Sequence, residues 1–204
     1  MKRAAEHFKK VDPILYGAFI EVVGKNGKLK ILTSKKSGSY FADLCEAIIN
    51  QQLSAKVAST IFARFKKLYP KQRVTAKYTL TIPNDKIRAV GPSNSKVKFI
   101  KDLAKRIESG ELRVENLSKM DNEEVSSELV KVKGIGPWTV EMFLMFSLGR
   151  EDVFSKGDYG LKSAIKKLYD LKSMPTNRQL EKITSNWSPY RTYACMILWR
   201  SSEK

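Results

Sequence analysis

Residues 129–161 read LVKVKGIGPWTVEMFLMFSLGREDVFSKGDYGL, and this stretch decides the fold. It begins with an apolar segment, turns at residues 134–136 (GIG), and enters a strongly apolar helix at Pro137. Proline suits a first helical position because its missing N–H is not needed there. The helix is predicted to end near Gly149, after which polar residues lead to one acid, Asp158, between two glycines. We expect the remaining chain to form a helical body that holds this hairpin and this acid beside each other.

The two glycines of the turn, Gly134 and Gly136, predict a tight turn with positive φ and close approach of the backbone to a ligand. The N–H groups of the turn and of the helix start are then directed outward. Such a place binds anions, and a DNA phosphate is a natural occupant. A lone G-x-G is also typical of an ordinary helix–helix turn, so the two glycines alone do not decide between these roles.

The segment LVKVKGIGPWT at 129–139 resembles the hairpin of helix-hairpin-helix DNA glycosylases, most closely the DNA-3-methyladenine glycosylase II family. Two further segments agree with this resemblance. IINQQLS at 48–54 resembles the segment of the family that fills the gap left by a flipped base, and WSPYRTYA at 187–194, followed by LWR at 198–200, resembles its C-terminal helix. The resemblance covers roughly residues 41–200, with the three motifs in the family's order.

The fold class expected from the resemblance and the sequence pattern is all-α. The resemblance implies two helical lobes around a DNA-binding cleft, in one glycosylase domain over residues 1–204 with the hairpin at about 129–148. Apolar residues at helical spacing predict helices at 4–10, at 13–23 and from Tyr40 onward, and almost no stretch alternates as a strand does. Residues 24–39, which close the N-terminal segment (residues 1–39), predict a long loop or a short hairpin.

Several short signals place helix ends. Asp12 before Pro13 predicts a helix start, and Asp121 with Glu124 and Thr176 with Gln179 have the spacing of capping boxes. Ser95 is predicted to open a helix with an apolar face formed by Ile100, Leu103, Ala104 and Ile107.

The charge predicts a polyanionic partner. The chain has 38 lysines and arginines against 21 acids, a formal net charge of +17. Phosphate backbones are the partner that such an excess favours, although a merely basic soluble protein has the same composition. Lysines 96, 98, 101 and 105 lie on one expected helix, where contact with DNA and a solvated face explain them equally well.

The composition also argues against an iron–sulfur protein and against a membrane protein. The two cysteines, Cys45 and Cys195, lie in apolar helical patterns and are expected to be buried thiols. They cannot form the four-cysteine iron–sulfur site that some relatives of the fold carry. No apolar run reaches the ~20 residues that span a bilayer, so we expect no membrane partner. The expected protein is a monomer, located in the nucleus if the organism is eukaryotic and otherwise in the cytoplasm.

Asp158 is the candidate catalytic acid. The resemblance implies that an aspartate shortly after the hairpin helix faces the sugar of the flipped nucleotide, where its carboxylate stabilises the positive charge that develops as the N-glycosidic bond breaks. The residues themselves offer another role, because an aspartate here also suits the N-cap of a helix that begins near Tyr159.

The resemblance assigns further residues to the base pocket and the wedge. Trp138 stands where glycosylases with lyase activity carry a Schiff-base lysine, which implies hydrolysis without a strand cut. The implied base pocket consists of Trp138, Met142 and Tyr190, although packing in the core explains Tyr190 equally well. The implied DNA contacts are Gln52, Leu53 and Ser54 in the wedge, and Gly134, Ile135, Gly136 and Thr139 in the hairpin.

Two positions depart from the family. Met142 stands where some members place an aromatic residue, and Ser54 is small where a bulkier side chain could fill the gap. The resemblance also implies an alkali ion, Na⁺ or K⁺, held by backbone carbonyls of Val130, Val132 and Ile135, and no organic cofactor.

The function expected is therefore that of a monofunctional DNA glycosylase in base excision repair, which flips and releases alkylated, cationic purines such as 3-methyladenine. Its partner is double-stranded DNA with a damaged or abasic nucleotide. The two departures favour an alternative, a protein of the same fold that binds damaged or abasic DNA and excises little. A nonspecific nucleic-acid scaffold that uses only the charge is a third possibility.

Overall fold

In a computed structural model of the chain, every regular element among the described residues, 1–24 and 38–202, is a helix, which confirms the all-α prediction. The predicted loop or hairpin within 24–39 lies almost wholly outside the described residues. The α-helices are α1 (Lys2–Val11), α2 (Pro13–Gly24), α3 (Tyr40–Asn50), α4 (Ala55–Lys66), α5 (Ala76–Thr81), α6 (Asn84–Ala89), α7 (Asn94–Glu108), α8 (Asn122–Leu129), α9 (Pro137–Phe146), α10 (Tyr159–Leu168), α11 (Asn177–Thr184) and α12 (Arg191–Ser201). Short 3-10 turns are η1 (Pro70–Gln72), η2 (Val114–Asn116) and η3 (Ser185–Trp187).

The helices form two compact units. The central unit comprises the described residues within 36–148, and the terminal unit combines the described residues within 1–35 and 149–204. Both ends of the chain therefore belong to the same unit.

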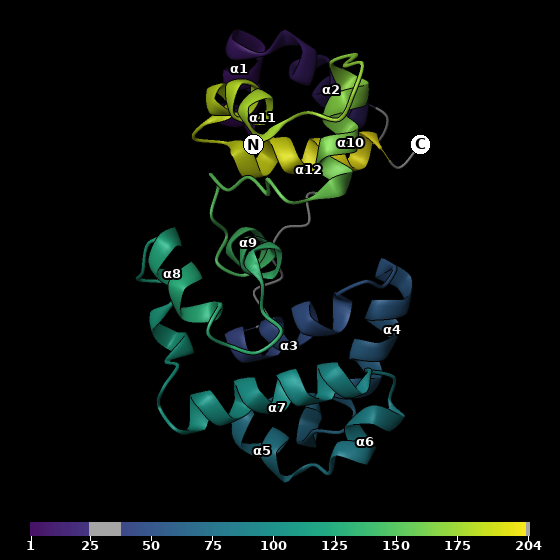
Figure 1. Cartoon of the computed structure of the whole chain (residues 1–204), viewed down its shortest axis with the longest axis vertical. Coiled ribbons are helices and arrows are strands. Elements are labelled where there is room, and N and C mark those ends of the chain that lie inside the picture. Colours follow the sequence, from purple (N-terminus) through teal and green to yellow (C-terminus); the bar gives the residue numbers. More distant parts are fainter. Residues whose placement is uncertain (25–37, 203–204) are drawn as a thin grey trace. The chain divides into compact units, whose positions relative to one another are not determined.

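The central unit is built around α3, which packs against α4, α7 and α9, while α5 and α6 cover α7 (Figure 1). The apolar side chains that the periodicity assigned to α3 are buried, among them Leu44, Cys45, Ile48 and Ile49, each 0% exposed. Burial of each such side chain stabilises the fold by about 1.5–3 kcal/mol. This core fixes the backbone at the end of α3, where the predicted wedge begins.

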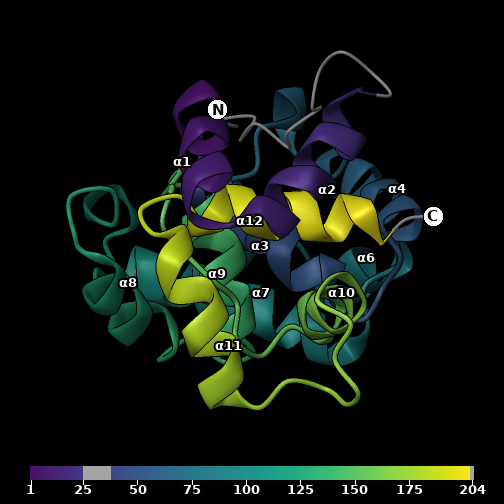
Figure 2. The ribbon, with the colours of Figure 1, turned by 90° about the horizontal axis from the view of Figure 1, so that it is seen from above.

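In the terminal unit, α12 packs against α2 and α10 (Figure 2). The 3-10 turn η3 contacts both α1 and α11. Its centre holds a buried polar cluster. The Asp12 carboxylate caps α2 by accepting a hydrogen bond from Leu15 N (3.0 Å), and it also accepts bonds from the Tyr169 hydroxyl and from Trp187 Nε1 (2.7 Å). The predicted helix start at Asp12 is confirmed, and the same residue links three elements.

The helix caps predicted from the sequence are confirmed at two helices and misassigned at a third. Both predicted capping boxes, at Asp121 and at Thr176, are present. Ser95 was predicted to open α7, but Ser93 Oγ accepts the hydrogen bond from Lys96 N (3.3 Å) and is the N-cap, so the helix begins at Asn94. Cys45 and Cys195 are buried thiols, as predicted.

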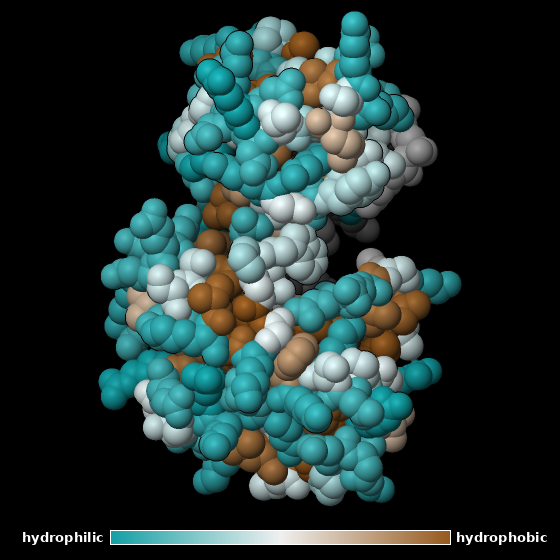
Figure 3. Space-filling view, in the orientation of Figure 1, coloured by the Kyte–Doolittle hydropathy of each residue, from teal (hydrophilic) through white to brown (hydrophobic). Residues whose placement is uncertain are grey.

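The surface is mostly hydrophilic on the face shown in Figure 3, but hydrophobic side chains gather over α4. Leu53, just before α4, is 38% exposed and Val57 on α4 is 47% exposed. Among the described helices, none combines the length and the hydrophobicity that a membrane-spanning segment requires.

Candidate nucleic-acid interface

The hairpin turn between α8 and α9 is closed by its own backbone. Val132 N donates to Leu129 O (3.1 Å) and Ile135 N donates to Val132 O (3.1 Å). Because the Ile135 N–H is used inside the turn and its side chain is only 4% exposed, this residue presents little to a ligand except its carbonyl. The prediction that the N–H groups of the turn point outward is wrong for Ile135.

Gly134 is required by the fold. Its φ of +81° lies in the left-handed region, and a Cβ at this position would stand 2.1 Å from Cδ2 of Phe99 on α7. Both the backbone conformation and the close packing against the ring therefore exclude a side chain.

Gly136 has a different character. Positive φ was predicted at both glycines and is wrong here, because φ is −100° and a Cβ would meet no atom within 4 Å. Nothing in the described structure demands glycine at this position. Gly136 is the N-cap of α9 and no side chain caps the first N–H groups of that helix, so an external anion would be favoured at the positive end of the α9 dipole.

The wedge turn, residues 51–54, connects α3 to α4 and has an unusual backbone. Gln52 adopts φ +57°, which is costly for a residue with a side chain. Leu53 N donates to Asn50 O (3.2 Å), and Ser54 Oγ caps α4 by accepting from Val57 N (3.4 Å). Gln52 and Leu53 are exposed, so the turn presents their side chains while Ser54 caps the next helix.

Gln51 joins the wedge turn to the hairpin, a link that no sequence motif indicated. Its Nε2 donates to Gly134 O (2.8 Å) and to Thr139 Oγ1 (3.1 Å). The Thr139 side chain is 3% exposed, so its hydroxyl lies inside the unit as a partner of Gln51.

A cavity of about 620 Å³ lies between the wedge turn and the hairpin, entirely within the central unit. It brings together three regions: the wedge, the N-terminus of α7 and the N-terminus of α9. Its lining includes Gln51, Gln52, Ser93, Lys96, Gly136, Trp138 and Thr139. Trp138 is 38% exposed, a large value for an indole. Residue 52 of the predicted wedge and residues 136, 138 and 139 of the predicted hairpin, from two separate motifs, thus surround one cavity.

Two of the lysines on α7, Lys96 and Lys101, bind backbone carbonyls. Lys96 Nζ donates to Ile49 O (2.9 Å) and Gln51 O (2.7 Å), and Lys101 Nζ donates to three carbonyls at the end of α5, Thr79 O (2.7 Å), Leu80 O (3.2 Å) and Ile82 O (2.5 Å). Partial burial lowers the pKa of both ammonium groups. They stabilise helix ends, a role that neither predicted alternative included.

Asp158 lies in the terminal unit as the N-cap of α10, so the structural role considered from the sequence is present. Its Oδ1 accepts hydrogen bonds from Leu161 N (2.8 Å) and from Trp199 Nε1 (3.3 Å). The indole contact comes from α12, and no local pattern predicts it. The carboxylate is therefore held in one orientation by two donors.

The loop that leads to Asp158 is fastened to the start of α12. Arg191 Nε donates to Asp152 Oδ1 (2.6 Å) and its Nη2 to Asp152 Oδ2 (2.9 Å), while Ser188 Oγ also donates to Oδ2 (2.8 Å). Partial burial acts to raise the pKa of the Asp152 carboxyl, but these hydrogen bonds outweigh it and hold the pKa below its usual value. Arg191 belongs to a recognised motif, whereas its partner could not be read from the sequence.

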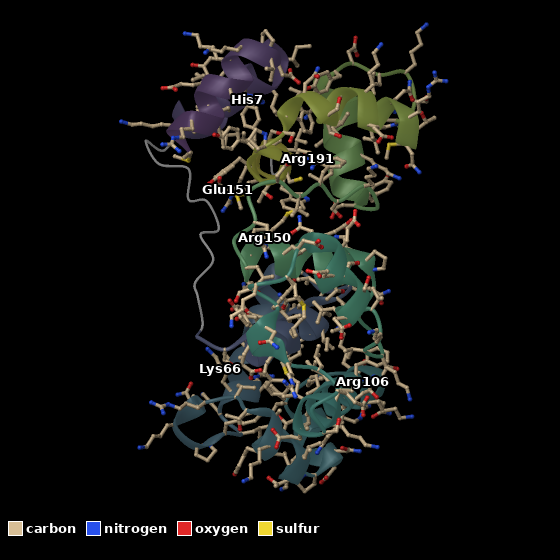
Figure 4. The ribbon with its side chains drawn as sticks, turned by 90° about the vertical axis from the view of Figure 1, so that its left-hand side faces the viewer. His7, Lys66, Arg106, Arg150, Glu151 and Arg191 are labelled. Atoms are coloured by element: carbon tan, nitrogen blue, oxygen red, sulfur yellow. The ribbon has the colours of Figure 1, made fainter. Side chains whose placement is uncertain are left out.

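The predicted pocket residues are divided between the units. Met142 is half-buried on α9, in the central unit with Trp138, whereas Tyr190 is half-buried in the terminal unit with Asp158. The Tyr190 ring meets the His7 ring edge-on, with 5.5 Å between the ring centroids, and its centroid lies 6.1 Å from that of the Tyr193 ring. Figure 4 labels His7 on α1. Packing within the terminal unit therefore explains Tyr190, and a pocket role stays a prediction.

The carbonyls of Val130, Val132 and Ile135 remain the predicted alkali-ion ligands. Neutral oxygens are a suitable donor set for such an ion. Val132 O already accepts one bond, from Ile135 N, and a carbonyl oxygen has two acceptor positions, so the set retains capacity for an ion.

Comparison with known proteins identifies the family. Residues 45–189 match the HhH-GPD superfamily of base excision DNA repair proteins. The chain is 34% identical to DNA-3-methyladenine glycosylase 1 of Schizosaccharomyces pombe, covering 80% of this chain and 72% of that protein. It is 33% identical to the Bacillus subtilis protein YfjP over 81% of this chain, but spans only 60% of that protein.

A solved structure of the Schizosaccharomyces pombe 3-methyladenine DNA glycosylase Mag1 in complex with abasic DNA superimposes with a TM-score of 0.85 at 30% identity, covering 99% of this chain and 97% of that one. The resemblance predicted from three motifs is confirmed. The chain belongs to the HhH-GPD superfamily of base excision DNA repair proteins.

Proposed function

We propose that the protein is a monofunctional DNA glycosylase that flips alkylated, cationic purines such as 3-methyladenine out of duplex DNA and releases them by hydrolysis. The observation that carries this proposal is the carboxylate of Asp158, fixed by Leu161 N and Trp199 Nε1 in a chain of this superfamily.

The chemistry needs little more than this carboxylate. As the N-glycosidic bond breaks, positive charge builds on the sugar, and a carboxylate held in one orientation stabilises that charge without reorganising. The same group can orient or deprotonate a water molecule. An alkylated purine already carries a positive charge and leaves without a general acid.

The product of this reaction is an abasic site. Trp138 cannot form the Schiff base that a lysine forms, so strand cleavage is not expected. Borohydride treatment of the protein with damaged DNA is predicted to trap no covalent complex.

The exposed indole of Trp138 supports the preference for cationic bases. The face of an indole attracts a cation with about 0.5–2 kcal/mol, and Trp138 lines the cavity beside the wedge turn. The relatives named as 3-methyladenine glycosylases agree with this substrate class.

A protein that binds damaged or abasic DNA without excising bases is the second candidate. Two features favour it: the small Ser54 side chain caps α4, and Met142 stands on the hairpin helix at a position where some members of the family place a pocket aromatic residue. Both features weaken capture of the base more than binding of the backbone.

Release of free 3-methyladenine and 7-methylguanine from methylated duplex DNA tests the proposal. Wild type is expected to release both, and Asp158→Asn is expected to lose at least about a hundredfold in rate. Asparagine is a good N-cap, so the variant keeps α10 and its DNA binding.

The second candidate makes the opposite prediction. If wild type releases no base yet binds an abasic analogue far more tightly than intact duplex at the same salt concentration, the chain is a damage-binding protein. Full activity in Asp158→Asn would remove this residue from the mechanism.

A further inference from the structure

One face of α7 touches every region of the interface in the central unit. Residues 96, 99 and 102 are spaced by three positions and therefore project from the same side of the helix. Lys96 contacts the wedge turn, the Phe99 ring packs on Gly134, and Asp102 Oδ2 accepts a hydrogen bond from Lys133 N (3.1 Å). A single rigid element thus contacts both the wedge and the hairpin.

The contact of Lys96 is placed where the wedge begins. Its ammonium group donates to Ile49 O (2.9 Å) and to Gln51 O (2.7 Å), the carbonyls that α3 leaves at its C-terminal end. A cation at this end is favoured by the helix dipole, and a hydrogen bond from a charged donor is stronger than one between neutral groups. The next residue, Gln52, has the left-handed φ of +57°.

A strained turn persists only where its surroundings determine it. Lys96 holds the main chain at Gln51, and the Gln51 side chain holds Gly134 O and Thr139 Oγ1 of the hairpin. The backbone on the N-terminal side of Gln52 is thereby fixed from two directions.

We propose that Lys96 is a positioning residue for base flipping, which holds the wedge turn in the shape that enters the duplex and in a fixed position relative to the hairpin. The inference rests on the proposed function. Unstacking a base step costs a few kcal/mol, and the inserted wedge offsets part of this cost because it keeps the bases from restacking. If the wedge turn must first become ordered, part of that stabilisation is lost. Lys96 therefore acts on insertion and not on the general attraction to phosphate.

The matched pair Lys96→Met and Lys98→Met tests this inference. Lys98 lies on the same helix and is exposed, so both variants lose one positive charge but only one loses the contact with the wedge. Insertion is measured by 2-aminopurine fluorescence, with the fluorophore next to a tetrahydrofuran abasic analogue and the protein at saturation. Lys96→Met is expected to shift the insertion equilibrium about tenfold toward the uninserted state, whereas Lys98→Met matches wild type.

A second readout separates positioning from stability. Lys96→Met is expected to lose excision of alkylated bases from duplex DNA and to recover it on single-stranded DNA, where no stacked duplex must be opened. Lys96→Arg, which keeps the charge and the donors, is expected to restore insertion. Should Lys96→Met fail to fold, Thr139→Val removes the acceptor for Gln51 at nearly constant volume, and a smaller shift in the same direction is expected.

The outcomes are distinguishable. Equal insertion by wild type, Lys96→Met and Lys98→Met overturns the inference and leaves the proposed function intact. No fluorescence change with wild type overturns the inference together with the base-flipping step of the proposed function. An equal loss of excision on duplex and single-stranded DNA shows that Lys96 serves stability alone.

Discussion

Replacing Gly134 by alanine is predicted to destabilise the central unit by about 2–5 kcal/mol. An L-residue in the left-handed region costs about 1–2 kcal/mol. The new Cβ would also stand 2.1 Å from the Phe99 ring, and overpacking of this kind costs about 1–3 kcal/mol. The two effects together correspond to a fall of about 4–20 °C in the melting temperature of a chain this long.

Gly136→Ala is the matched control, two residues away in the same turn. Its φ is −100° and its Cβ would meet no atom within 4 Å, so the change in unfolding free energy is expected to stay within about 0.5 kcal/mol. Affinity for duplex DNA is expected to fall, since the methyl group occupies the space in front of the α9 N-terminus.

Denaturant unfolding and fluorescence anisotropy with duplex DNA are the two assays. The double variant Phe99→Ala/Gly134→Ala separates the effects, because it removes the clash and leaves the backbone strain. Equal stability of Gly134→Ala and wild type would refute the reasoning, and so would equal destabilisation by the two single glycine substitutions.

Three further predictions concern single residues. Gln52→Gly relieves the left-handed strain and is expected to change the unfolding free energy by less than about 1 kcal/mol, while wedge insertion, measured by 2-aminopurine fluorescence, is lost with the side chain. Asp12→Ala leaves three donors without their acceptor and is expected to destabilise the terminal unit by about 2–4 kcal/mol in denaturant unfolding. The pKa of the Asp152 carboxyl is lowered in the folded protein. Its contribution to the free energy of unfolding is therefore complete above the unfolded-state pKa of about 3.9, and it disappears as the pH falls through the folded-state pKa. Unfolding titrations are therefore expected to show wild type and Asp152→Asn converging in stability on acidification.

For each of these three substitutions, one outcome would contradict the expectation. A marked loss of stability in Gln52→Gly would show that its side chain, and not its backbone, holds the turn. Wild-type stability of Asp12→Ala would mean that water replaces the carboxylate. A constant difference between wild type and Asp152→Asn down to low pH would mean that the Arg191 contact contributes no charge-dependent stability.

Much of the fold follows from local sequence. Periodic apolar residues place α3 and α7, and short polar signals place the starts of α8 and α11, because a cap depends on residues only three positions apart. The serine that opens α7 was misassigned as Ser95 instead of Ser93 because the two offer the same chemistry, and only the backbone conformation selects between them.

The site was predictable only where a motif carried it. Gln52, Gly136 and Trp138 were found from the resemblance, and the structure places them around one cavity. Lys96 and Gln51 were not assigned their roles, because a lysine that binds carbonyls has the same local sequence as one that faces solvent. Such long-range contacts depend on how distant segments pack, which spacing along the chain does not encode.

The terminal unit is assembled from chain segments on both sides of the central unit. This arrangement has a consequence for how the protein folds during synthesis. Helix α2 is apolar on most sides, and its partner α12 follows the central unit in the chain, so it is translated after that unit. The N-terminal helices must therefore wait on the ribosome until the whole central unit, which is contiguous, has emerged and can fold. Protease digestion of ribosome-bound chains of increasing length is expected to show protection of the central unit first, with α2 sensitive until α12 clears the exit tunnel.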